Sequence, residues 1–101
     1  CERVLQYRAL CISRNDKSDL PGFDEDHYVE HSNSNERQLQ DILNEYISVR
    51  QSTISLFESF NNNMLNIEGT ANGNVLTVEM CGYIIVGHEI HHRNVLNMKY
   101  V

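Results

Sequence analysis

Apolar residues recur every three or four positions along two stretches of the chain, and this spacing predicts two long helices. The stripe of the first consists of Leu39, Ile42, Leu43, Tyr46, Val49, Thr53, Leu56, Phe57 and Phe60. Asn33 followed by Glu36 fits a capping box at its start, and residues 61–63 are expected to end it. The second long helix is expected from Val78 to about residue 100, with Thr77 as its N-cap.

The rest of the chain adds one more helix and several connections. Strong helix formers with apolar positions at 4, 5, 7, 10, 11 and 12 predict a helix from residue 2 to about 14. Residues 15–22 are turn formers, residues 23–31 are acidic with room for a short helical turn, and residues 69–74 form a polar loop. No strand pairs are expected. The predicted class is all-α, an antiparallel bundle with three of the four helices of a complete one.

Composition limits the size and partners of such a domain. With 101 residues, 41% of them hydrophobic, the chain makes at most one small domain. A net charge of −6 argues against a nucleic-acid surface, which needs clustered Lys and Arg. The longest apolar run, residues 81–87, is too short to span a membrane. Three scattered cysteines without a CxxC pair favour a reduced, cytoplasmic setting.

The first residues suggest that the domain is larger than this chain. A helix that starts at residue 2 without a capping side chain is typical of one that has been cut. We therefore expect residues 1–101 to be the C-terminal portion of a single helical-bundle domain. A three-helix remnant would expose an apolar groove, so we also expect a homo-oligomer, most simply a dimer.

The chemistry of the chain is concentrated in residues 87–93. The expected inward face of the last helix consists of Cys81, Ile84, Ile85, His88, His92, Val95 and Met98 or Lys99. His88 and His92 are four residues apart, so their rings can share one metal ion, whereas His91 points to one edge of this face. Burying two rings requires polar partners for both, and a shared metal would meet that requirement. Core histidines that are hydrogen-bonded without a metal are the open alternative.

The same residues also satisfy the H-E-x-x-H pattern of zinc metalloproteases, in which Glu89 would be the general base. Only nine residues follow His92, and the longer H-x-x-G-x-x-H extension is absent. The protease therefore stays a minor alternative. His27 and His31 are expected to face solvent, and Asp24 to Asp26 to form a solvated acidic loop, since they lack the spacing of a calcium-binding EF-hand.

Taken together, five segments resemble the DinB/YfiT-like family of small helical-bundle proteins, in the family's own order. They are residues 2–10, 20–29, 35–39, 69–74 and 83–96. The resemblance implies a four-helix bundle that binds zinc or nickel through three histidines, one on the second helix and an H-x-x-x-H pair on the last. His88 and His92 match that pair. The place of the first ligand would lie upstream of Cys1, and Cys1 itself is about one turn away as a substitute thiolate.

The resemblance also implies a function. The family includes metal-dependent enzymes that act with low-molecular-weight thiols, so the leading hypothesis is a thiol-dependent transferase or related hydrolase with a small-molecule substrate. Glu89, His91 and Arg93 would then support the ligands or meet an anionic substrate. A non-catalytic bundle with a vestigial histidine cluster is the second hypothesis, and the metalloprotease is the third.

Overall fold

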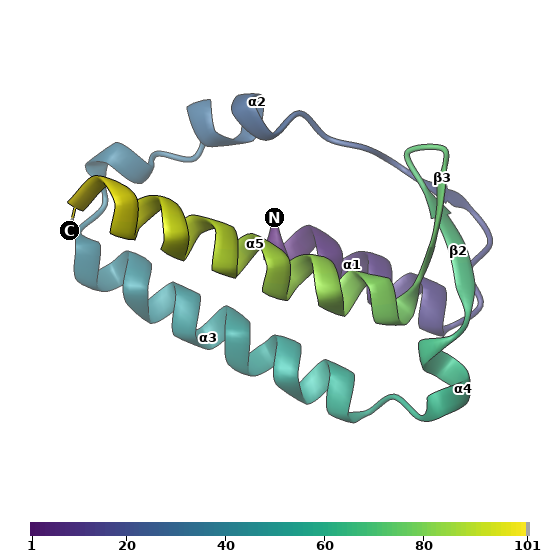
Figure 1. Cartoon of the computed structure of the whole chain (residues 1–101). Coiled ribbons are helices and arrows are strands. Elements are labelled where there is room, and N and C mark those ends of the chain that lie inside the picture. The colour runs from purple at the N-terminus through teal and green to yellow at the C-terminus, as the bar shows by residue number, and fades with distance from the viewer. Residues whose placement is uncertain (101) are drawn as a thin grey trace.

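Three long helices lie along the length of the molecule in this computed structural model (Figure 1). It describes the backbone of residues 1–100 and the side chains of residues 1–90 other than Ser34. The long helices are α1 (Glu2–Ser13), α3 (Leu39–Glu58) and α5 (Val78–Tyr100). The shorter elements are β1 (Asp19–Leu20), α2 (Glu25–Glu30), the 3-10 turn η1 (Ser34–Glu36), α4 (Asn62–Leu65), β2 (Glu68–Ala71) and β3 (Asn74–Thr77).

The path between α1 and α3 sets the directions of the helices. This segment carries α2 and returns along the length of the molecule, so α1 and α3 point the same way while α5 runs opposite to both (Figure 1). α1 packs against α5 and against α3, and it is therefore the central helix of the three. The predicted antiparallel arrangement holds for α5 against its two partners, but not for α1 against α3.

The three periodic stretches are helices, as predicted, but the ends of α3 differ from expectation. Asn33 has a positive φ of 61°, and its carbonyl accepts from the Glu36 amide in the turn η1. The predicted capping box is therefore wrong, and α3 starts later, with Gln38 as its N-cap. The helix also ends before the asparagines, since Asn61 instead caps the short α4 through the Met64 amide. Thr77 caps α5 as predicted, accepting from the Met80 amide at 3.1 Å.

A small three-stranded sheet replaces the predicted loop, so the expectation of a chain without strand pairs is wrong. β2 and β3 form a hairpin, and β1 pairs in parallel with β2. Asn72 and Gly73 make the turn with φ values of 52° and 77°, which is the positive-φ pair that tight two-residue hairpins require. The Asp19 carboxylate accepts from the Gly73 amide and fixes the turn to β1.

The core lies where the sheet meets α1 and the start of α5. Its buried members are Ala9, Ile12, Leu20, Ala71, Leu76, Val78 and Cys81. Burial raises the pKa of the Cys81 thiol to about 11, so the side chain stays a neutral thiol in the core. Ile84, predicted on the inward face of α5, is 37% exposed, whereas Ile85 is buried. Across the part of the chain that the structure describes, no helix is long and apolar enough to cross a bilayer.

Candidate metal and polar site

His88 lies at a cavity between the three long helices. The side chain is half-buried on α5, in a cavity of about 190 Å³ formed with the first turn of α1 and the middle of α3. The other residues that line it are Cys1, Glu2, Leu5, Tyr46, Arg50, Ile85 and Glu89. The prediction that His88 faces inward is consistent with this position, on the side of α5 that carries the buried Ile85.

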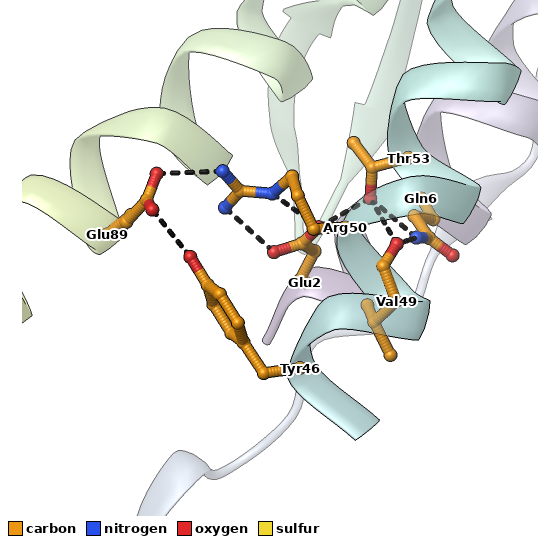
Figure 2. Close-up of polar contacts among 7 residues, drawn as sticks. All are labelled: Glu2, Gln6, Tyr46, Val49, Arg50, Thr53 and Glu89. Atoms are coloured by element: carbon orange, nitrogen blue, oxygen red, sulfur yellow. Dashed lines mark hydrogen bonds and ion pairs between the residues drawn. The ribbon is translucent and has the colours of Figure 1, made fainter. Parts of the chain in front are cut away.

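Arg50 joins all three helices at this cavity (Figure 2). Its Nη2 and Nε donate to the two carboxylate oxygens of Glu2 on α1, at 3.0 and 3.1 Å. Its Nη1 donates to Oε2 of Glu89 on α5 at 2.7 Å. The side chains of all three residues are less than 25% exposed, so this is a partly desolvated ion-pair network with a two-pronged arginine contact.

Three neutral side chains extend the network on both sides of Arg50 (Figure 2). The Tyr46 hydroxyl donates to Oε1 of Glu89, and the ring of Tyr46 lies 5.6 Å from the Arg50 guanidinium carbon. The Thr53 hydroxyl donates to Glu2 and accepts from the Gln6 amide, which also donates to the Val49 carbonyl at 2.9 Å. Both carboxylates are thus held by donors from α3.

The network fixes the charge states around the cavity. Burial by itself raises the pKa of Glu2, but hydrogen bonds from Arg50 and Thr53 and the charge of Arg50 outweigh it, so the pKa lies below its usual value. The hydrogen bond to Glu89 raises the pKa of Tyr46, and bonds to Glu2 and Glu89 raise that of Arg50. Glu2 therefore stays ionised at neutral pH, paired with the Arg50 guanidinium.

Comparison with known proteins supplies the family. A sequence model of the DinB superfamily matches residues 1–96. The chain belongs to the DinB superfamily. No curated protein and no solved structure matches it. The match runs from the start of α1 through most of α5, so the DinB region includes the whole Arg50 network and both histidines of the H-x-x-x-H pair.

The DinB histidine pair is described in part. His88 is placed at the cavity, while the side chains of His91, His92 and Arg93 lie outside the described residues. The α5 backbone continues as helix through this region, which puts position 92 one turn beyond His88. Cys1 lines the same cavity, and its thiol contacts a carboxylate oxygen of Glu25 at 3.4 Å.

His27 and His31 are exposed, as predicted, and they lie close together. His27 and His31 lie one turn apart at α2, and Glu30 joins them in a cluster of side chains whose ligand atoms lie within 4.8 Å of one another. Asp24 caps α2 by accepting from the backbone amides of Asp26 and His27. That cap explains one carboxylate of the acidic segment without a bound cation.

The polar network around Arg50 was not anticipated from sequence. Arg50 occupies the inward stripe of α3 between Tyr46 and Thr53, four and three residues away. A single arginine amid such a stripe needs a carboxylate partner, because a buried cation must be paired. That signal was present in the sequence. The partners Glu2 and Glu89 could not be found in the same way, since they come from two other helices.

Proposed function

We propose that this protein binds one divalent metal ion, zinc or nickel, through His88 and His92 of α5. DinB proteins are generally metal-binding, and the residue spacing fits two imidazoles on one helix face. The observation that carries the proposal is the position of His88 at the cavity that Glu2 and Glu89 also line, because carboxylates close to a site favour a cation. Within the family's four-helix bundle, α1, α3 and α5 would be three of the four helices.

The finer proposal is a thiol-dependent transferase, or related hydrolase, acting on a small molecule. A bound divalent ion would supply an acidified water or thiol at neutral pH. The chain's own residues would fix the orientation of α5 at His88. Arg50 donates to both Glu89 and Glu2, and Tyr46 donates to Glu89, so these hydrogen bonds restrict rotation of α5. Arg93 and His91 remain proposed contacts for a substrate or a ligand ring.

The Arg50 network also provides evidence on two other functions. A non-catalytic bundle is favoured by the structural role of Arg50, which ties three helices together without any metal. The metalloprotease is disfavoured, because both oxygens of Glu89 already accept from Tyr46 and Arg50. In addition, β3 ends directly before α5, eleven residues from His88 and about 16 Å along the axis, so this strand does not lie beside Glu89.

Substitution of the pair is expected to remove this metal site. His88→Ala and His92→Ala, each made together with His27→Ala and His31→Ala to remove the α2 histidines, should weaken zinc or nickel binding at least about tenfold, because each takes away a ligand. Titration calorimetry against a metal-chelator competitor measures the change. The matched control carries only His27→Ala and His31→Ala and should keep one equivalent of metal.

Unchanged affinity after loss of His88 and His92 would contradict the metal proposal. Activity separates the enzyme from the non-catalytic bundle. The metal-loaded control variant, mixed with a low-molecular-weight thiol and the electrophile chlorodinitrobenzene, should consume thiol faster than the metal-free protein. Equal rates would favour the non-catalytic bundle while leaving the metal site intact.

We also propose that the chain pairs with a second copy of itself along a groove between α3 and α5. The groove has a volume of about 430 Å³, and most of its lining is apolar, with Ile54, Phe57, Leu65, Ile85 and Val86 among the residues. Ile54 and Val86 are 50% and 48% exposed on the facing helices. Apolar surface of this extent favours burial against another surface.

A charge placed in this groove is expected to dissociate the pair. Val86→Asp should raise the dimer dissociation constant at least about tenfold, since a buried unpaired carboxylate costs more than 1.4 kcal/mol. Sedimentation equilibrium measures the constant. Val75→Asp changes a valine on β3 that is 63% exposed and lies outside the groove, and it should leave association unchanged. A wild-type chain that stays monomeric at high concentration would contradict the proposal.

A further inference from the structure

Three metal-binding side chains meet on one short helix that the proposed DinB site does not use. His27 and Glu30 belong to α2 and His31 is its C-cap, and their steps of three and one place all three on the same side of this turn. One ligand atom from each lies within 4.8 Å of those of the other two. The two imidazole rings are 4.3 Å apart between centroids. Because two ligands of a metal at about 2.1 Å are at most about 4.2 Å apart, only small rotamer changes are needed to place one ion between them.

The hydrogen bond of His31 leaves one ring nitrogen ready for a metal. Nδ1 of His31 lies 2.9 Å from the backbone carbonyl oxygen of His27. A carbonyl oxygen only accepts, so in the neutral ring Nδ1 carries the proton and Nε2 keeps its lone pair. A histidine that donates one nitrogen to a carbonyl while the other faces an ion is the usual arrangement of a metal ligand.

The negative charge and the exposure of α2 favour cation binding by these three side chains. Residues 24–31 contain Asp24, Glu25, Asp26 and Glu30 and no Lys or Arg, so the segment attracts cations. All three ligand residues are exposed, so a metal can reach them without opening the fold. α2 is also anchored: Phe23 contacts the Tyr28 ring at 4.9 Å, and Arg8 of α1 lies over Phe23.

We propose that His27, Glu30 and His31 form a second, surface metal site for a divalent transition metal such as zinc, nickel or copper. Two imidazoles and one carboxylate are ligands for these ions, and an open position remains for water or another donor. None of the three residues lines the cavity of His88, so this site does not depend on the proposed DinB site.

The test uses the full chain with His88→Ala and His92→Ala, so that only the α2 site remains. This variant should bind about one equivalent of zinc in a chelator-competition titration. Adding His27→Ala or His31→Ala should weaken that binding at least about tenfold. Glu30→Gln should weaken it more than Glu25→Gln, which removes the same charge from the same helix but no ligand. Equal effects of the two glutamine substitutions would assign the binding to charge alone and overturn the three-ligand site.

A second measurement on the wild-type chain removes any dependence on the folding of that variant. Paramagnetic copper added to 15N-labelled protein should broaden the backbone amide signals of residues 24–32 at substoichiometric amounts. His31→Ala should abolish this broadening while leaving any broadening near residue 88 in place. Copper that leaves residues 24–32 unaffected would overturn the α2 site, and the two regions report on the two proposals separately.

Discussion

Replacing Arg50 by methionine is expected to cost about 2 to 3 kcal/mol of unfolding free energy, because it leaves two carboxylates facing each other without a cation. Glu2 and Glu89 are 17% and 24% exposed, so solvent replaces the lost guanidinium only in part. The midpoint of urea unfolding, followed by far-UV circular dichroism, measures the loss.

A matched surface pair provides the control for Arg50. Arg3→Met removes the ion pair with Glu45, whose side chains are 68% and 40% exposed, and should leave the unfolding midpoint nearly unchanged. Adding Glu2→Gln and Glu89→Gln to Arg50→Met should recover part of the loss, because the unpaired charges are then gone. A loss as small as that of Arg3→Met would show that the three-helix network contributes nothing specific to stability.

Truncation of Ile12 to alanine should destabilise the chain by about 3 kcal/mol, within the range for large-to-small changes in a core. Ile12 is fully buried where α1 meets β2. The backbone of β2 lies directly on it, because a Cβ added at Gly69 would overlap with Cγ1 of Ile12. Urea unfolding measures the cost, and Leu10→Ala, two residues away at a 39% exposed position, should cost much less.

The contact between Ile12 and Gly69 gives that prediction a second test. Gly69→Ala should destabilise the wild-type chain, because its methyl group has no room beside the isoleucine. In the Ile12→Ala background the same methyl group enters the space left by the truncation, so its cost should be smaller. Additive costs would mean that β2 does not pack on Ile12 as the structure describes.

The elements that could be predicted are those whose information is local. The helical body of α3 and the Thr77 cap of α5 depend on residues within a few positions of each other, and both are as expected. The family was also recognisable from sequence, through segments that include His88 and His92. The hairpin was missed although Asn72-Gly73 is a strong turn signal, because the flanking strands are only four residues long and too short for a clear alternation.

The site itself shows where sequence stops being sufficient. Local spacing determined that α5 would be a helix and that His88 would share a face with Ile85, because both follow from 3.6 residues per turn. Only the tertiary structure decided that Glu89 accepts from Arg50 and Tyr46, and that Arg50 also holds Glu2 at the start of α1. Those contacts span 39 to 48 residues, and they depend on which faces the three helices turn toward one another. Packing sets those faces, and no pattern within a single helix encodes them.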